Sequence, residues 1–399
     1  MALIVEKFGG SSLADLQRLR NAAEIIASAY KKENQVVVVV SAQGDTTDYL
    51  VEKAAEIGTN VSEREMDVLL STGEQISMAL VAMTLMGMGI PAVSLCGWQA
   101  GVHTDQMHGR ARIEHVDTTR IRQELEAGRV VIVAGFQGVT AKNDITTIGR
   151  GGSDTTAVAL AAALKADVCR IYTDVDGVYS ADPRVVRSAV KHYEIDYDEM
   201  LELASLGAQV LHNRSVEMAK RFGVQLEVLS SFAGRPGTRV REVGMEQRNV
   251  SGVARDQNVA LVRLEGMNDR PGNAWRVMAL LSGEKINVDI ILQPPAEGGK
   301  SGMTFSVPRS AVDRTVEVLV ENKTALGFES MTVDEHVCKI SIVGAGMASR
   351  FGIAAQMFEA LYKQDINLHC ITTSEIKISV IVSEADADRA FIAVHDAFF

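Results

Sequence analysis

The sequence predicts an α/β protein made of a large, mostly parallel sheet with helices on both sides, followed by two copies of a smaller βαββαβ module. Three observations support this prediction. Apolar runs alternate with helical patterns up to about residue 240, the pattern changes after about residue 245, and the later part repeats itself at an offset of 80 residues. At 399 residues the chain is also longer than one hydrophobic core usually supports.

The first part contains six runs rich in β-branched residues, which predict strands at 2–8, 36–41, 90–96, 129–135, 167–173 and 224–230. Their nearly continuous apolarity is typical of parallel strands buried on both faces. Helical patterns, among them 13–31, 74–87 and 209–222, lie between the strands. In such sheets ligands bind at the carboxyl ends of the strands, so we expect the site in the turns that follow them.

The later part reads as an internal repeat, because NDRPG (268–272) aligns with ASRFG (348–352) and INVDIILQ with INLHCITT. The first copy predicts strand 259–266, helix 271–284, strands 286–293 and 302–309, helix 311–326 and strand 329–336. The second copy predicts strand 338–344, helix 351–364, strands 366–373 and 376–382 and helix 386–397, without a fourth strand. We expect VSGVARD (250–256) to supply that strand, which gives domains 1–245, 258–336, and 250–256 with 337–399.

Composition and charge exclude several classes of protein. The net charge of −11 argues against nucleic acid as a partner, since phosphate backbones are held by basic surfaces. The four cysteines, Cys96, Cys169, Cys338 and Cys370, form no CxxC pair and are expected to be reduced thiols. The sequence has no apolar run of 18 residues and no signal-peptide pattern, so we expect a cytoplasmic enzyme that does not enter a membrane.

Three glycine-rich turns are predicted at strand-to-helix junctions: KFGGSS (7–12), SAQGDTTD (41–48) and GRGGSDTT (149–156). Glycine lets the backbone approach a ligand closely, and free N–H groups at a helix start favour an anion. One such turn alone could be a simple tight bend. Three of them, two carrying the cations Lys7 and Arg150, indicate an anion-binding site.

Other motifs are ambiguous or misleading. PPAEGGKS (294–301) and GAGMASRFG (344–352) resemble nucleotide motifs but lack required glycines. Taken alone, TDVDGVYSADPR (173–184) is typical of a polar surface loop. The histidines of HTDQMHGRARIEH (103–115) lack the spacing of a helical zinc site and are expected to be solvated. Glu74, which enters an apolar helix, is either a first-turn residue or a ligand contact.

Taken together and in order, KFGGSS, SAQGDTTD, STGEQ (71–75), GRGGSDTTA and TDVDGVYSADPR resemble the aspartate kinases of the amino-acid kinase family. The C-terminal repeat resembles their paired ACT domains. The resemblance implies a three-layer αβα, carbamate-kinase-like catalytic domain followed by two ferredoxin-like domains. It also implies ATP-dependent phosphorylation of the β-carboxylate of L-aspartate to 4-phospho-L-aspartate, the first step toward lysine, threonine, methionine and diaminopimelate.

The chemistry agrees with this resemblance. A carboxylate with an ordinary pKa near 3.9 is already ionised at neutral pH, so this nucleophile needs no general base. The enzyme has to position two anions and stabilise charge on the transferred phosphoryl group. This accounts for a chain without a recognisable Ser/His/Asp or Cys/His arrangement.

The resemblance assigns roles residue by residue. Lys7 and Asp154 are the expected catalytic residues, with Asp154 a polar organiser rather than a base. The expected ATP-binding residues are Lys7, Phe8, Gly9, Gly10, Ser11, Ser41, Ser153, Thr173, Asp174, Tyr179, Asp182, Arg184 and Gln209. The expected aspartate-binding residues are Asp45, Thr46, Thr47, Glu74, Arg150, Gly151 and Gly152. Magnesium is expected to arrive with ATP, with no metal site made by the protein itself.

The ACT resemblance implies lysine and/or threonine as effectors and a homo-oligomer or an α2β2 assembly formed through these domains. The expected effector residues are Asp269, Arg270, Pro271, Gly272, Asn273, Ala274, Asn287, Val288, Asp289, Gln293, Met347, Ser349, Arg350 and Asn367. Two positions depart from the family pattern: Gln209 stands where a lysine is common, and Phe351 stands where a proline is usual. Two alternatives stay open, an amino-acid kinase acting on acetylglutamate or glutamate and a non-catalytic amino-acid sensor.

Overall fold

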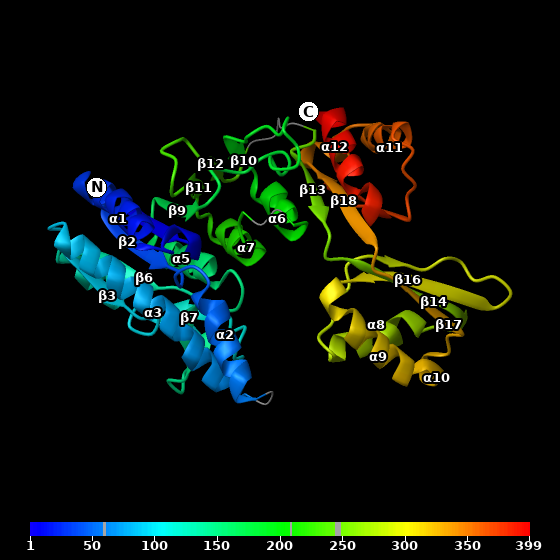
Figure 1. Ribbon diagram of the computed structural model, residues 1–399, viewed down its shortest axis with the longest axis horizontal. Coiled ribbons are helices and arrows are strands. Elements are labelled where there is room, and N and C mark those ends of the chain that lie inside the picture. The colour runs from blue at the N-terminus through cyan, green and yellow to red at the C-terminus, as the bar shows by residue number, and fades with distance from the viewer. Residues whose placement is uncertain (59–60, 208–209, 244–248) are drawn as a thin grey trace. The chain divides into compact units, whose positions relative to one another are not determined.

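The computed structural model describes residues 1–399 apart from 59–60, 208–209 and 244–248, and apart from the side chains of 348–349. It divides into two compact units (Figure 1). The first unit comprises Met1–Tyr179 and Lys191–Gln247, and the second comprises Ser180–Val190 and Arg248–Phe399.

The first unit is built on an eight-stranded sheet with the order β10-β12-β11-β9-β1-β2-β6-β3. All neighbouring strands are parallel except β11 and β12. The strands are β1 (Leu3–Phe8), β2 (Gln35–Val40), β3 (Ala92–Leu95), β6 (Val130–Ala134), β9 (Val168–Thr173), β10 (Glu194–Ile195), β11 (Leu226–Ser230) and β12 (Thr238–Val240). The six strands predicted from apolar runs all form, and β2 and β6 are buried along almost their whole length.

Helices cover both faces of this sheet. The helices are α1 (Leu16–Lys31), α2 (Thr46–Ile57), α3 (Glu63–Gly87), α4 (Thr119–Glu126), α5 (Gly152–Leu164), α6 (Tyr197–Ser205) and α7 (Asn213–Phe222). On one face, α1 and α3 share an apolar core with Phe8 and with Val36, Val38 and Val40 of β2. Lys7 alternates with Phe8 along the strand and points to the opposite face, where α5 packs on β1, β2 and β9. The result is the predicted three-layer αβα arrangement.

The long helix α3 begins at Glu63, eleven residues before the predicted start at Glu74. Its first turns, EREMDVLL, are too charged to extend the apolar pattern from which the helix was predicted. By length and composition α3 could cross a membrane, but almost half of its most apolar stretch is buried inside this unit. Its apolar character is therefore accounted for by packing on the sheet.

A second, smaller sheet of the first unit has the order β5-β4-β7-β8. Its strands are β4 (Val102–Thr104), β5 (Ile113–Val116), β7 (Gln137–Val139) and β8 (Ile145–Thr147). Because β8 leads directly into the turn 148–151 before α5, this sheet sets the position of that turn.

The second unit contains two four-stranded antiparallel sheets, β15-β16-β14-β17 and β13-β18-β20-β19. The strands are β13 (Gly252–Asp256), β14 (Ala260–Asn268), β15 (Ile291–Leu292), β16 (Lys300–Val307), β17 (Ser330–Asp334), β18 (Val337–Val343), β19 (Cys370–Thr373) and β20 (Lys377–Ser383). The helices are α8 (Asn273–Gly283), α9 (Val312–Glu321), α10 (Lys323–Leu326), α11 (Ile353–Lys363) and α12 (Ala387–Phe398). The strands expected at 286–293 and 366–373 shorten to β15 and β19, since their first residues lie outside the ladders.

The backbone repeats at the same offset of 80 residues as the sequence. Gly272 and Gly352 precede α8 and α11 with φ of 93° and 89°. Lys285 and Asp365 follow these helices with φ of 60° and 54°. Since β13 pairs along β18, we propose module boundaries at 258–336 and at 250–256 with 337–399.

Candidate active site

Three loops meet at the carboxyl ends of β1, β2 and β9. The backbone N–H of Ser41 donates to the Phe8 carbonyl at 3.1 Å, and that of Gly9 donates to the Tyr172 carbonyl at 3.3 Å. The N–H of Gly44 donates to the carbonyl of Gly10 at 3.1 Å. These bonds join the turns KFGGSS and SAQGDTTD, as predicted from the order of a parallel sheet. A side chain at Gly10 would lie 2.6 Å from the carbonyl oxygen of Ala42, so only glycine fits there.

Lys7 and Asp154 form an ion pair at this edge, with 2.6 Å between Nζ and Oδ1. Asp154 Oδ1 has no hydrogen-bond partner among the described residues, so the attraction is chiefly one of charge. Both side chains are about one-eighth exposed, which limits screening by water. The pair therefore holds one strong cation in place beside the turn at Gly9 and Gly10.

The first turn of α5 is the third glycine-rich element. Gly151 precedes the helix with φ of 67°, and a Cβ there would lie 2.1 Å from Cγ of His212. Ser153 and Asp154 are buried in the first turn of the helix. Burial lowers the pKa of His212, so this ring is neutral near pH 7. The turn thus lies at the positive end of a 13-residue helix, whose start has no side-chain cap.

Arg150 stands in the same turn, and its side chain is exposed. Within the part of the chain that the structure describes, no carboxylate forms an ion pair with it. Its guanidinium group is therefore available for a carboxylate ligand, which it can bind through two parallel N–H donors.

Glu74 lies inside α3 rather than in its first turn, which removes one of the two interpretations of this residue. It is 3% exposed, and its Oε1 accepts the backbone N–H of Ala42 at 3.1 Å. Its Oε2 has no hydrogen-bond partner among the described residues. Burial raises the pKa of Glu74 to about 7. A buried carboxylate with one free oxygen is suited to bind a cationic group.

The start of α2 lies next to Glu74. The Thr46 hydroxyl donates to the Gln43 carbonyl at 2.6 Å, while Asp45 caps no backbone group with its side chain. A Cβ at Gly73 would lie 2.8 Å from the Ala42 side chain, so this glycine lets α3 approach the turn closely. The predicted residues 45–47 and Glu74 are thereby brought together.

The predicted nucleotide loop is divided between the two units. Thr173 ends β9 at the same sheet edge, where its carbonyl accepts the Ser231 hydroxyl at 3.2 Å. The Tyr179 hydroxyl donates to Asp176 at 2.8 Å. Asp182 and Arg184 pair with each other at 2.9 Å within the second unit, so their role toward ATP stays a prediction. Gln209 lies outside the described residues.

Most of the predicted effector residues are exposed around the starts of α8 and α11 and the segments that follow these helices. Asp289 accepts Nζ of the buried Lys339 at 2.5 Å, and Asn273 donates to the Asn268 carbonyl. Met347 is an exception, because its side chain packs into the apolar core of the second sheet. The exposed members are Asp269, Arg270, Pro271, Gly272, Asn287, Gln293, Arg350 and Asn367. Ser349 belongs to the undescribed side chains.

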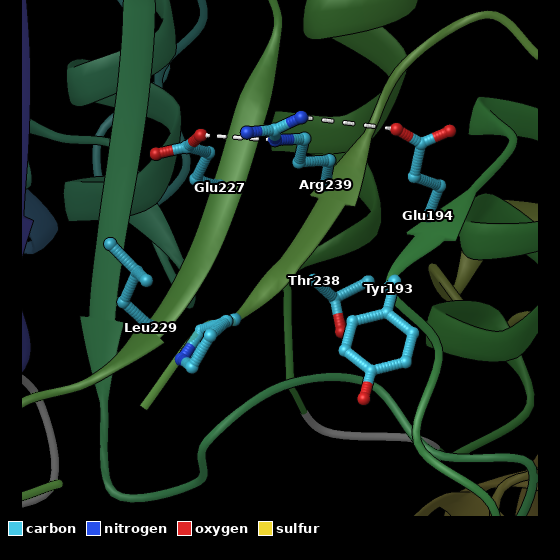
Figure 2. Close-up of a pocket in the computed structure, with 8 residues that line it drawn as sticks. Tyr193, Glu194, Glu227, Leu229, Thr238 and Arg239 are labelled. Atoms are coloured by element: carbon cyan, nitrogen blue, oxygen red, sulfur yellow. Dashed lines mark hydrogen bonds and ion pairs between the residues drawn. The ribbon is translucent and has the colours of Figure 1, made fainter. Parts of the chain in front are cut away.

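A cavity of about 370 Å³ lies on β11, β12 and β10, and none of the predicted site residues lines it (Figure 2). It is lined by Tyr193, Glu194, Glu227, Leu229, Pro236, Gly237, Thr238 and Arg239. Figure 2 shows Arg239 between Glu227 and Glu194. The ion-pair distances are 3.3 Å to Glu227 and 4.0 Å to Glu194. These charges satisfy one another, so the cavity adds nothing to the candidate site.

The sequence reasoning missed Asp67, which is fully buried on α3 two turns before Glu74. It also placed His108 in solvent, whereas His108 Nδ1 lies 2.8 Å from Asp67 Oδ2. His103 and His115 instead stack on each other with ring centroids 4.3 Å apart. The one available signal was the spacing of seven residues between Asp67 and Glu74, which puts both acids on one face of a helix.

Comparison with known proteins agrees with this geometry. The model of the amino acid kinase family matches residues 2–230, and a model of the ACT domain matches residues 340–398. This match defines the class of protein as an amino acid kinase with a regulatory-type C-terminal part.

The relatives narrow the class. Aspartokinase 2 of Bacillus subtilis is 50% identical over 400 residues, covering 100% of this chain and 98% of the relative. The chain therefore belongs to the aspartokinases of the amino acid kinase family. Crystal structures of E. coli aspartokinase III match with 26% identity and a TM-score of 0.84 for a complex with aspartate and ADP (R-state), covering 100% of both chains. A complex of the same enzyme with lysine and aspartate (T-state) matches with 25% identity and a TM-score of 0.79, covering 100% of this chain and 99% of that one.

Proposed function

We propose that this enzyme transfers the γ-phosphoryl group of ATP to the β-carboxylate of L-aspartate, giving 4-phospho-L-aspartate and ADP. The observation that carries the proposal is that Lys7, Arg150 and Glu74 gather around one sheet edge of an aspartokinase fold, with one oxygen of Glu74 unpartnered among the described residues. These three groups complement a phosphate, a carboxylate and an ammonium group, which are the charges of ATP and aspartate.

On the nucleotide side, Lys7 and the N–H groups after β1 hold the ATP phosphates. A unit charge about 4 Å from a phosphate oxygen is worth roughly 4 kcal/mol at an effective dielectric near 20. Asp154 keeps the Lys7 ammonium in position and acts as an organiser, not as a base. Mg²⁺ is proposed to arrive bound to the ATP phosphates. When bound, Mg²⁺ neutralises charge on the transferred phosphoryl group.

On the aspartate side, Arg150 binds the α-carboxylate through two N–H donors and Glu74 binds the ammonium group. The β-carboxylate is then directed toward the nucleotide as an ionised nucleophile, so no proton has to be removed. The turn at Gly151 and Gly152 and the start of α2 shape the pocket around it. Catalysis consists of positioning two anions and stabilising the charge between them.

The second unit is proposed to regulate this reaction through lysine, threonine or both. Support comes from the ACT match at 340–398, the repeated backbone at Gly272 and Gly352, and the relative crystallised with lysine. We further propose a homo-oligomer, or an α2β2 assembly, formed through these modules in the cytoplasm. Exposed edge strands such as β15 and β19 are the kind of element through which such sheets associate.

The test is an ADP-release assay with MgATP and a panel of acceptors: L-aspartate, L-glutamate and N-acetyl-L-glutamate. We expect aspartate to give by far the highest kcat/KM. A preference for glutamate or acetylglutamate would transfer the chain to another substrate class within the amino acid kinases. ADP release no faster than without acceptor, together with binding of lysine or threonine, would favour a non-catalytic sensor.

A further inference from the structure

Asp67 is a buried carboxylate for which the proposed reaction has so far given no use. Its Oδ1 accepts the Thr147 hydroxyl at 2.5 Å, and its Oδ2 accepts Nδ1 of His108 at 2.8 Å. Both oxygens lie 3.0 Å from the backbone N–H of Gly109. Asp67 therefore joins three segments distant in sequence: α3, the loop before β5, and the end of β8.

The loop held by Asp67 packs directly against the turn that carries Arg150. A Cβ at Gly149 would lie 3.1 Å from the carbonyl oxygen of Gly109 and 3.6 Å from Cα of Arg110. Gly149 has φ of 82°, so the backbone there is fixed in a conformation that glycine adopts easily. The position of Arg150 thus depends on the position of the loop at Gly109.

Three further hydrogen bonds hold the loop at residues 108–111 and the turn 148–151 in place. The N–H of Ala111 donates to the Thr147 carbonyl at 2.8 Å. Arg214 donates to the carbonyls of Ile148 and Ala111 at 2.7 and 3.1 Å. Gly109, Arg110 and Arg214 contact the turn 148–151 directly, and the buried Asp67 binds Gly109. An ionised carboxylate accepts all three donors at once, which an amide cannot do, because one side of an amide is itself a donor.

We propose that Asp67 is a positioning residue for aspartate recognition, acting through the loop at His108 and Gly109 on the place of Arg150. The inference rests on the proposed function, in which Arg150 binds the α-carboxylate of aspartate. Asp67 touches no reacting atom. It affects the position of Arg150 relative to the substrate carboxylate. That position matters because a misplacement of about 1 Å can cost about a hundredfold in rate.

The test is a double-mutant cycle on purified full-length enzyme, made of the wild type, Asp67→Asn, Arg150→Ala and the double variant. We expect each single substitution to lower kcat/KM for aspartate about ten- to hundredfold, mainly through KM, while KM for ATP stays within about threefold. If Asp67 acts through Arg150, the double variant is no worse than the poorer single variant by more than about threefold. Losses that multiply would overturn the inference.

A matched control separates positioning from stability. Glu124 is another buried acid with two close partners, Arg120 and Arg129, and it lies on α4 away from the turn at Arg150. Glu124→Gln should lower the melting temperature and leave KM for aspartate unchanged. If Asp67→Asn does not fold, Thr147→Val removes a single donor and should still raise KM for aspartate while leaving KM for ATP unchanged. An unchanged KM for aspartate in Thr147→Val would also overturn the inference.

Failure of the proposed function gives a different result. A folded wild-type enzyme that does not phosphorylate aspartate would contradict the assignment of the substrate. An active wild type with additive losses in the cycle would contradict only the role of Asp67.

Discussion

At the scale of single residues, the most informative group is Glu74. The sequence showed an acid in an apolar helix and left two interpretations open. The structure places it in the interior of α3, with one oxygen bonded to Ala42 N–H and the other without a partner among the described residues. Because a buried carboxylate oxygen without a partner is costly, this oxygen is suited to bind a cationic group.

The raised pKa of Glu74 predicts a pH dependence. Since that pKa is about 7 in the free enzyme, half of the molecules carry a neutral Glu74 at neutral pH and bind the substrate ammonium poorly. We expect kcat/KM of the wild type for aspartate to fall about tenfold per pH unit below 7. In Glu74→Gln, kcat/KM for aspartate should be much lower and should no longer depend on pH in this way. The measurement is a pH profile of both variants, with kcat/KM for ATP at saturating aspartate as the control. An identical profile in Glu74→Gln would contradict the role.

The same shift affects stability. An acid whose pKa is raised on folding favours the folded state fully below its unfolded value of 4.5, and this contribution is lost as the pH rises through about 7. Because each pKa unit is worth about 1.4 kcal/mol, Glu74→Gln should be more stable than the wild type by roughly 3 kcal/mol at pH 8. Urea unfolding at pH 5 and pH 8 measures the difference, and a variant less stable than the wild type at pH 8 would contradict it.

At the scale of elements, the start of α5 depends on a glycine for two separate reasons. Gly151 has a positive φ, and any side chain there would collide with His212. Gly223, at the end of α7, has almost the same φ of 65° but open space around it. Comparing an alanine substitution at each of the two glycines therefore separates the cost of backbone strain from the cost of a collision.

We expect Gly223→Ala to lose about 1 kcal/mol of unfolding free energy, the usual cost of the left-handed region, with unchanged activity. Gly151→Ala should lose more and should also raise KM for aspartate, because the displaced turn carries Arg150. Chemical denaturation and steady-state kinetics of both variants provide the test. If Gly151→Ala and Gly223→Ala lose the same stability and have the same KM for aspartate, His212 moves aside easily and the turn is not constrained.

The elements also show how far sequence reasoning reached. Buried strands were predictable because continuous apolar runs such as 36–41 have few other structural uses. The glycine turns were predictable because parallel strands bring their carboxyl ends to one edge. The role of Asp67 was not predictable from the sequence, since its partners come from residues 108–109 and 147. The polar segment 180–190 gave no sign that Ala181 and Val186 pack in the core of the second unit.

At the scale of the whole molecule, the proposed regulation requires a ligand with different affinity for two states of the enzyme. The repeated turns at Gly272 and Gly352 give each module a similar helix start, and the segment after α8 carries Asp289. Nζ of Lys339 lies 2.5 Å from the Asp289 carboxylate and 3.5 Å from that of Asp256. Replacing Asp289 therefore leaves Lys339 with one carboxylate partner.

We predict that lysine, threonine or the pair inhibits the wild type, and that Asp289→Asn needs at least about tenfold more effector for half-inhibition, the loss of roughly one charged hydrogen bond. Its uninhibited kcat should not change. Asp334→Asn, at the end of β17, is the matched exposed control. Half-inhibition concentrations measured at fixed substrate levels decide the matter, and equal sensitivity of Asp289→Asn and the wild type would remove Asp289 from the effector site.

The most direct test of the central claim is detection of the phosphorylated β-carboxylate. An acyl phosphate reacts with hydroxylamine to give a hydroxamate, so the wild type with MgATP, aspartate and hydroxylamine should form the β-hydroxamate of aspartate in step with ADP. Lys7→Met, which keeps most of the length of the side chain without its charge, should remain folded and lose most of kcat, since a charge worth roughly 4 kcal/mol is missing. Product formed only from the α-carboxylate, no hydroxamate at all, or a Lys7→Met enzyme as fast as the wild type would contradict the account.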